Sequence, residues 1–339
     1  MSDAVRFALA RVTEGETLED AEMGAAMDAI LAGEATPAQI AGLAIALRMR
    51  GETSSEIAAA VRALRRAATP LDVAPGTKLL DTCGTGGDGL GTFNVSTVVA
   101  IVAAAARVKV AKHGNRAVSS RAGSADVLEA LGVRIDLSPA RAAEVLDEVG
   151  ITFLFAPAHH AALRHAAAVR RELGVRTFFN LLGPLANPAC ATHQLLGIYD
   201  PTRLVAIAEV LRALGVERAA VVHGEGGLDE IAPTGRTKVA FLADGSVREL
   251  SWQPSDFGVD EAPLSTLVGG DATENAGIAR SILEGEPGPR RGMIVLNAGA
   301  ALLVAGLVST PEEGAKLAAA TIDEGRAAAL LTRWVEATR

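Results

Sequence analysis

A glycine-rich segment with polar residues behind it is the first feature of the sequence that could bind a ligand. It reads GTGGDGLG from Gly84 to Gly91, and Asn94, Ser96 and Thr97 follow before a long apolar stretch. Glycines let backbone N–H groups approach an anion closely, and the next helix start adds unpaired donors and the positive end of its dipole. The segment therefore predicts an anion-binding loop, although a tight turn with a polar N-cap would use the same residues.

The charge pattern around this loop favours the anion-binding interpretation. Between Gly89 and Ala125 the sequence contains neither Asp nor Glu, although the whole chain has a formal net charge of -8. The same window contains the basic residues Arg107, Lys109, Lys112, Arg116 and Arg121. A solvated basic face could explain part of this bias, but a ligand with several phosphate groups to neutralise explains it better.

Two other phosphate-binding loops are disfavoured by the residues that follow. The letters GTGGDG from Gly84 to Gly89 match G-x-G-x-x-G, which in dinucleotide-binding enzymes is followed by an acid about 20 residues later. Here that stretch reads VKVAKH from Val108 to His113, with bases instead of the acid. A Walker-type loop would need Gly-Lys-Ser/Thr at a set spacing, which is missing too. A dehydrogenase or a nucleotide triphosphatase is therefore disfavoured.

An adjacent acid pair supplies a second candidate site. Asp229 and Glu230 lie in a glycine-rich stretch directly after an expected strand at 219–223, where the carboxyl end of a parallel strand would open into a ligand crevice. Carboxylate oxygens suit Mg²⁺, which often bridges protein carboxylates and substrate phosphates. On the residues alone, an acid pair in a turn is more often solvated than bound to a metal.

The elements that must position these residues divide the chain into two parts. Residues 3–68 show helical spacing of apolar residues, with helix-start signals at Thr17, Thr36-Pro37 and Thr53. Beyond Pro70 short apolar runs alternate with helical patterns, which predicts an α/β fold with a central, largely parallel sheet. Strands are expected at 78–80, 108–111, 152–155, 195–199, 219–223 and 292–296, a hairpin at 237–250, and helices at 202–214, 273–284, 297–308 and 310–337.

Length, composition and cysteine spacing indicate the size of the fold and disfavour several classes of protein. The chain has 339 residues, 49% of them hydrophobic, which is enough for two domains with large cores. Cys83 and Cys190 lie far apart without C-x-x-C spacing, which argues against a disulfide framework or a zinc site and fits a reducing cytoplasm. Charges interrupt every apolar run near a terminus, so we expect neither a signal peptide nor a membrane span. The acidic net charge also disfavours nucleic acid as a partner.

Taken together, these motifs resemble the anthranilate phosphoribosyltransferase family, and the resemblance covers nearly the whole chain. The segments that carry it are 81–91 with Asn94 to Thr97, KHGNR at 112–116 with Ser119 and Ser120, GSADVLE at 123–129, RTFFNLLGPL at 176–185 and HGEGGLDE at 223–230. The family has a fold like that of nucleoside phosphorylases. The resemblance implies a helical domain of residues 1–70 joined by a returning segment at about 177–190, an α/β catalytic domain of residues 71–339, and substrate bound between them.

The resemblance also implies the reaction, which is transfer of phosphoribose from 5-phosphoribosyl 1-pyrophosphate (PRPP) to the amine of anthranilate. This is the second step of tryptophan biosynthesis from chorismate. The residues expected around PRPP are Gly84, Gly87, Asp88, Thr92, Asn94, Val95, Ser96, Thr97, Lys112, His113, Gly114, Asn115, Arg116, Ala117, Val118, Ser119, Ser120 and Ser124. Loss of pyrophosphate leaves a cation-like sugar and a highly charged leaving group, so hydrogen-bond donors and Mg²⁺ must stabilise the departing oxygens.

Particular roles follow from the same resemblance. Anthranilate is expected at Gly84, Asn115 and Arg170, and two Mg²⁺ ions at Ser96, Asp229 and Glu230. The residues assigned to catalysis are Lys112, as a point charge for the leaving group, His113 and Asn115. An aromatic amine is already an uncharged nucleophile at neutral pH, so His113 is expected to position substrate rather than act as a general base. We expect inversion at the anomeric carbon, and the resemblance implies a homodimer formed through the helical domain.

The sequence departs from the family pattern ahead of Arg170, and it leaves two other functions open. Where the family often has His-Pro-Ala-Met and a later proline before Val-Arg, this chain has HAAL from His160 and Ala168 before Val169. The helix that carries Arg170 could therefore differ in geometry. A pyrimidine nucleoside phosphorylase is the nearest alternative enzyme, and a phosphoribosyl-binding sensor without activity is an alternative of another class.

Overall fold

The N-terminal part of the chain is a bundle of helices. The computed structural model describes residues 1–86, 89–117 and 121–339. Thr36 and Thr53 cap two of the helices in the expected capping boxes, whereas the second helix is capped by Glu19 rather than Thr17. The helices of this unit are α1 (Asp3–Thr13), α2 (Asp20–Leu31), α3 (Pro37–Arg50) and α4 (Ser54–Arg66).

The rest of the chain is built on a seven-stranded sheet of order β3-β2-β1-β4-β5-β6-β7. The first five strands run parallel to one another, and the last two add an antiparallel hairpin next to β5 at one edge, as predicted. The strands are β1 (Leu80–Gly84), β2 (Val110–Gly114), β3 (Ile151–Phe155), β4 (His193–Gly197), β5 (Arg218–Gly224), β6 (Thr237–Ala243) and β7 (Ser246–Trp252).

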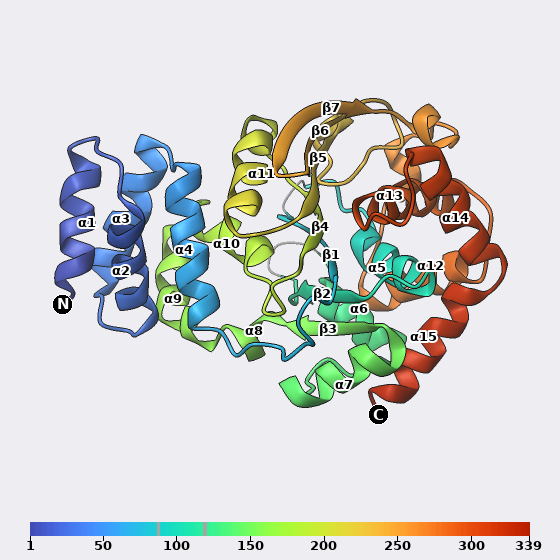
Figure 1. The fold of residues 1–339 in the computed structure, drawn as a ribbon, viewed down its shortest axis with the longest axis horizontal. Coiled ribbons are helices and arrows are strands. Elements are labelled where there is room, and N and C mark those ends of the chain that lie inside the picture. The colour runs from blue at the N-terminus through green and yellow to red at the C-terminus, as the bar shows by residue number, and fades with distance from the viewer. Residues whose placement is uncertain (87–88, 118–120) are drawn as a thin grey trace.

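Helices cover both faces of this sheet (Figure 1). They are α5 (Val95–Ala105), α6 (Ser124–Leu131), α7 (Pro139–Val149), α8 (Ala156–His159), α9 (Arg164–Leu173), α10 (Phe179–Leu185), α11 (Leu204–Ala213), α12 (Ala272–Leu283), α13 (Pro289–Val304), α14 (Pro311–Asp323) and α15 (Arg326–Ala337). Short 3-10 turns lie at Ala161–Leu163, Pro201–Arg203, Glu225–Gly227, Pro254–Phe257 and Leu264–Leu267. The predicted fold class, a small helical unit plus a larger unit with a largely parallel sheet, is confirmed.

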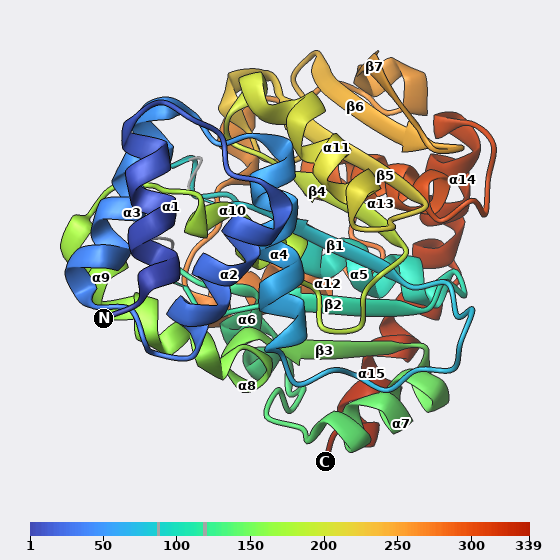
Figure 2. The ribbon, with the colours of Figure 1, turned by 60° about the vertical axis from the view of Figure 1, so that its left-hand side comes forward.

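The alternation of side chains along the strands divides the interior into two large apolar clusters. Leu195 of β4 faces a cluster with α5, α12, α13 and α15, whereas the next residue, Leu196, faces the cluster on the opposite side. That second cluster contains α10, α11 and the whole helical unit. Figure 2 shows α4 of the helical unit in front of the sheet, next to α11. The helical unit and the sheet therefore share one core.

One expected strand is wrong, and several other elements differ in their bounds. Residues 292–296 form no strand, because they lie within α13, where the side chains from Met293 to Val304 are all buried. A helix buried on every side shows a continuous apolar run that periodicity cannot distinguish from a core strand. The expected helix at 310–337 is two helices separated at Gly325, and the strand expected at 78–80 is β1, which extends into the glycine segment as far as Gly84.

A helix that crosses a membrane must be both long and apolar. In the parts of the chain that the structure describes, no helix combines the necessary length with the necessary apolar character.

Candidate active site

The candidate site lies where the strand order of the sheet reverses. From β1 the chain proceeds to β2 and β3 on one side, and it then returns to β4 on the other side of β1. Open α/β sheets bind ligands at the carboxyl ends of the strands beside such a switch point. Glycines end the strands there, namely Gly84 on β1, Gly114 on β2 and Gly197 on β4. Backbone and ligand can therefore approach each other closely at this edge.

The glycine loop that follows β1 is held at both ends. The Thr85 amide donates to the Gly197 carbonyl at 2.9 Å, and the Thr85 hydroxyl accepts from the Tyr199 amide at 3.2 Å. At the far end, the Gly269 amide donates to the Gly91 carbonyl at 2.8 Å. Gly86, Gly89 and Gly91 have positive φ angles, a conformation that other residues rarely adopt. Gly87 and Asp88, both predicted to bind PRPP, lie outside the described residues.

Asp229 is brought directly against this loop. Its side chain is buried, and one carboxylate oxygen accepts a hydrogen bond from the Gly86 amide at 2.7 Å. A Cβ atom at Gly84 would lie 2.6 Å from the same oxygen, and one at Gly197 would overlap the Asp229 backbone carbonyl. The structure therefore places Asp229 beside Gly84 and Gly86 of the glycine segment. Gly197 was not predicted as a site residue, since the atom that it must clear is remote in sequence.

Lys112 and Ser96 also meet at this edge. The Lys112 ammonium is only 2% exposed and donates to the Thr82 carbonyl at 2.5 Å and to the Ser96 hydroxyl at 3.2 Å. Burial lowers the pKa of Lys112, while the charges of Asp81 and Glu230 oppose that shift. Lys112 therefore places a buried positive charge beneath the first turn of α5, next to a hydroxyl that was predicted to bind metal.

Three of the other bases in the acid-free segment pair with acids from outside it. Lys109 pairs with Asp147 at 2.7 Å, and Arg121 lies 3.8 Å from Glu274. Arg116 pairs at 2.9 Å with Asp126 and also contacts Glu129. These contacts weaken the inference that the basic residues of the segment neutralise phosphate groups. The fold brings acids from elsewhere in the chain to three of them.

The segment after β2 is tied through its backbone to the start of α6. Asn115 is exposed, and its carbonyl accepts from the Ala125 amide at 3.2 Å and from the Ser124 hydroxyl at 3.3 Å. The Ala117 amide donates to Asp126 at 2.9 Å. A Cβ atom at Gly114 would overlap the Ser124 hydroxyl. Three further residues predicted to bind PRPP, Val118, Ser119 and Ser120, lie outside the described parts of the chain.

The start of α5 is tied to α12, a helix that the sequence predicted at 273–284 but did not assign to the site. The Asn94 side chain donates to the Ala122 carbonyl at 3.1 Å and accepts from the Asn275 side chain of α12 at 2.9 Å. Thr92 pairs with Val268 in an isolated β-bridge. Of the other residues expected here, Val95 and Thr97 are buried within α5. No local pattern marks the 267–275 segment as part of the site.

His113 and Arg170 lie on the other side of the sheet from Lys112. Successive strand residues point to opposite faces, and the His113 ring packs edge-on against His160 at 5.1 Å between ring centres. Burial, with the neighbouring His160 and His159, lowers the pKa of His113 to about 3. Burial lowers the pKa of Arg170 as well, and its guanidinium lies 5.8 Å from the centre of the Phe179 ring at the start of α10.

Two family models and several named relatives match this chain. The model of a glycosyl transferase family a/b domain matches residues 76–328, and that of the same family's helical bundle domain matches residues 7–68. The anthranilate phosphoribosyltransferase of Moorella thermoacetica is 52% identical over 331 residues, covering 97% of each chain. The solved anthranilate phosphoribosyltransferase of Thermus thermophilus is 49% identical, with a TM-score of 0.93 and full coverage of both chains.

The chain belongs to the anthranilate phosphoribosyltransferase family. The resemblance inferred from the motifs is thereby confirmed. A more distant anthranilate phosphoribosyltransferase, from Saccharomyces cerevisiae, has been solved in complex with PRPP and Mg; it is 27% identical with a TM-score of 0.91, covering 99% of this chain and 98% of that one. The same yeast enzyme has also been solved in complex with 4-fluoroanthranilate.

The buried histidines of this family member predict a loss of stability in acid. The pKa values of His113 and His160 are lowered to about 3 and about 4, chiefly by burial. The unfolded chain binds these protons below pH ~6.5 and the folded chain does not, so stability present above that pH is lost as pH falls toward 4. At pH ~5 each histidine lowers the free energy of unfolding by roughly 2 kcal/mol, because each pH unit between the two pKa values contributes about 1.4 kcal/mol.

Asp81 acts in the opposite direction but offsets only part of this loss. Burial raises its pKa to about 6, so the folded chain takes up this proton first and gains roughly 1 kcal/mol by pH ~5. The free energy of unfolding, measured with urea at pH ~7 and ~5, should therefore fall by about 2–3 kcal/mol. His160→Phe should reduce this difference by roughly 2 kcal/mol, the contribution of that histidine. An identical pH dependence in that variant would contradict the assignment.

Proposed function

We infer that this chain transfers the phosphoribosyl group of PRPP to anthranilate, giving N-(5-phosphoribosyl)anthranilate and pyrophosphate in tryptophan biosynthesis. The observation that carries this inference is the contact of the Asp229 carboxylate with the Gly86 amide at the switch point, in a chain about half identical to named anthranilate phosphoribosyltransferases along its full length. That contact joins the acid pair and the glycine loop into one site. The pattern suits a diphosphate held by backbone amides together with a metal.

We propose that Ser96, Asp229 and Glu230 hold two magnesium ions. All three supply the hard oxygen donors that Mg²⁺ prefers. The Asp229 carboxylate lies against the glycine loop, and Glu230 lies close enough to Lys112 to influence its pKa. Bound magnesium would supply positive charge for the pyrophosphate oxygens. The yeast relative that was solved in complex with PRPP and Mg supports the use of magnesium.

The protein's own groups bind and orient the two substrates. Glycine-loop amides and the N-terminus of α5 hold the diphosphate, and the buried Lys112 ammonium fixes the Ser96 hydroxyl from beneath. Asn115, exposed at the end of β2, orients the anthranilate amine, while Arg170 holds the carboxylate. A His113 pKa of about 3 is far too low for efficient proton removal at neutral pH. His113 is therefore a positioning residue, and attack proceeds with inversion.

The activity is tested by mixing the purified protein with anthranilate, PRPP and Mg²⁺ and following the loss of anthranilate fluorescence. Steady loss that requires both PRPP and Mg²⁺ supports the proposal. Phosphorolysis of thymidine under the same conditions would favour the pyrimidine nucleoside phosphorylase alternative. Binding of PRPP without any turnover would favour the sensor. Either of the last two results overturns the proposed function.

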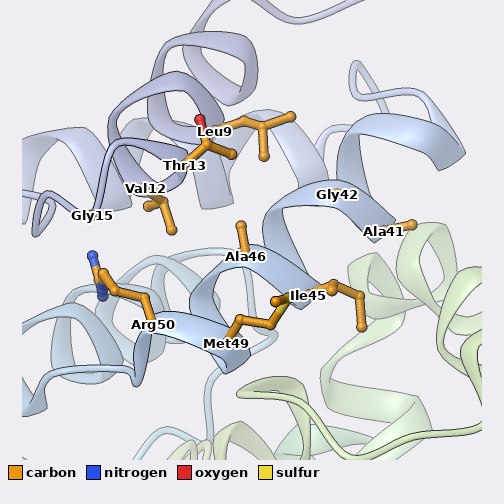
Figure 3. Close-up of a pocket in the computed structure, with 10 residues that line it drawn as sticks. All are labelled: Leu9, Val12, Thr13, Gly15, Ala41, Gly42, Ile45, Ala46, Met49 and Arg50. Carbon is orange, nitrogen blue, oxygen red and sulfur yellow. The ribbon is translucent and has the colours of Figure 1, made fainter.

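We further propose a cytoplasmic homodimer in which a second copy covers an apolar groove on the helical unit. The groove has a cavity volume of about 700 Å³ between α1 and α3, and Figure 3 shows Val12 and Leu9 bordering it opposite Ala46, Ile45 and Met49. Met49 is 82% exposed, which is unusual for a large apolar side chain.

The helical domain is proposed to comprise residues 1–70 with about 177–190, and the catalytic domain residues 71–339.

A charge in this groove should prevent dimer formation. Ala46→Glu would place a carboxylate between the apolar surfaces of the two copies, and burying that charge is costly, so we expect a dimer in the wild type and a monomer in the variant. Light scattering coupled to gel filtration measures the mass. Ala329→Glu, at an exposed position of α15, is the matched control and should remain dimeric. A monomeric wild type would refute the dimer.

A further inference from the structure

The sheet opens between β1 and β2 as it approaches the candidate site. Among the described residues of these two strands, Leu80 and Val110 form the one pair in register, and the Leu80 amide donates to the Lys109 carbonyl at 2.9 Å. A regular parallel ladder would continue with evenly spaced bonds toward the carboxyl ends. Here the backbone groups beyond Leu80 and Val110 take other partners.

Three side chains satisfy the backbone groups that would have formed the next rungs. The Ala111 carbonyl accepts from the Asn187 amide group at 2.8 Å, and the His113 amide donates to the Asp81 carboxylate at 3.1 Å. The Thr82 carbonyl accepts from the Lys112 ammonium at 2.5 Å. Side chains thus occupy the gap and leave none of these three backbone groups unpaired.

The opening is confined to one place in the sheet. On one side, β1 stays in register with β4 as far as Gly84 and Gly197. On the other side, β2 stays in register with β3 as far as Gly114 and Phe155. The gap therefore separates the strand that carries the glycine loop from the strand that carries Lys112 to Asn115. These are the two segments between which the donor substrate is proposed to bind.

The groups in the gap are buried, and they hold one another in place. Asp81 is 0% exposed, while Asn187 and Lys112 are each 2% exposed. The Asn187 amide group also donates to Asp81 at 2.8 Å, and its oxygen accepts from the Ala189 amide at 2.9 Å, which fixes its orientation. Burying such groups costs more free energy than a plain ladder would. A functional need to keep β1 and β2 apart would explain why the protein buries these polar groups.

We propose that Asn187 and Asp81 are positioning residues that hold β1 and β2 apart and set the width of the gap in which PRPP binds. This inference rests on the proposed function. In this proposal neither side chain contacts substrate: Asn187 acts through the Ala111 carbonyl and Asp81 through the His113 amide. Asn187 follows α10, so it also connects the gap to the helix whose first residue packs beside Arg170.

The test compares steady-state kinetics of Asn187→Leu, Asp81→Asn and the double variant with the wild type. Leucine keeps the branched shape of the Asn187 side chain but cannot donate a hydrogen bond. Asp81→Asn introduces an amide group that can turn a donor toward the donor of Asn187. We expect each single variant to raise KM for PRPP about tenfold or more, with a smaller change in kcat. Because the two residues act as one unit, the double variant should be no worse than the worse single variant.

Two controls separate positioning from a general loss of stability. Leu330→Ala removes buried apolar volume in α15 and should lower stability by about 2–5 kcal/mol without changing KM for PRPP. Thr321→Val removes a buried hydroxyl that bonds to Leu317 at 2.7 Å and should also leave KM unchanged. All rates are measured well below the unfolding temperature of each variant. If Asn187→Leu does not fold, Asp81→Asn alone decides the outcome.

Unchanged KM for PRPP in the folded variants, or a rise of equal size in Leu330→Ala, would overturn the inference about the gap. Fully additive effects in the double variant would also overturn it, because two independent residues would then be acting. A wild-type enzyme without turnover would instead refute the proposed function, so the two failures can be told apart.

Discussion

Replacing Asp229 and Glu230 together by alanine is expected to lower turnover at limiting magnesium by at least about 100-fold, the scale seen when one strong electrostatic group is removed from an active site. The change removes two of the three proposed metal ligands and also leaves the Gly86 amide without its carboxylate partner. Initial rates measured across a magnesium titration test the expectation. Excess magnesium should restore part of the activity.

The chain offers a matched control for this double substitution. Asp260 and Glu261 form the same dipeptide in an exposed loop, so their replacement by alanine removes equal charge away from the site. That variant should keep the wild-type dependence on magnesium. If the Asp229 and Glu230 variant kept it too, the metal assignment would be refuted.

Gly197→Ala is expected to lower kcat/KM by about 100-fold, since a misplacement of about 1 Å can have an effect of that size. The new methyl group would overlap the backbone carbonyl of Asp229, and a backbone atom cannot rotate away as the end of a side chain can. Either the 224–230 loop or the end of β4 must move. The carboxylate would then leave its position against the glycine loop.

Gly277→Ala on α12 is the control for adding a methyl group at a glycine. Among the described residues, apart from the chain neighbours and the backbone of the helix itself, no atom lies within 4 Å of the added Cβ. This variant should keep full activity, and stability should rise slightly, since alanine favours helix over glycine. Wild-type kcat/KM in Gly197→Ala would show that the position of Asp229 does not depend on this close approach.

Local patterns in the sequence were sufficient to find the glycine loop and the acid pair. Both follow strands, and the rule that the carboxyl ends of parallel strands meet at one edge predicts their proximity. The structure confirms this for Asp229 and Gly86, although they are 143 positions apart. The motif resemblance led to the family, which the comparisons confirm.

Other parts of the site could not be found from local patterns. Nothing in the residues around Gly197 reveals that the backbone of Asp229 passes beside it, and Asn187 gains its role only when β1 and β2 separate. The charge argument was incomplete for the same reason, since Asp126 and Glu129 reach Arg116 through the fold. The expected strand at 292–296 failed because burial on all sides removes the periodic signal that identifies a helix.

The core shared by the helical unit and the sheet has a thermodynamic consequence. Leu43 and Leu64 of the helical unit belong to the same buried cluster as Leu196 and Val221 of the sheet. Separating the two units in water would expose apolar surface on both, so neither can melt alone without destabilising the other. The chain is therefore expected to unfold in one cooperative transition with heat or denaturant. A substitution that destabilises an N-terminal helix should then lower the folded fraction of the whole enzyme.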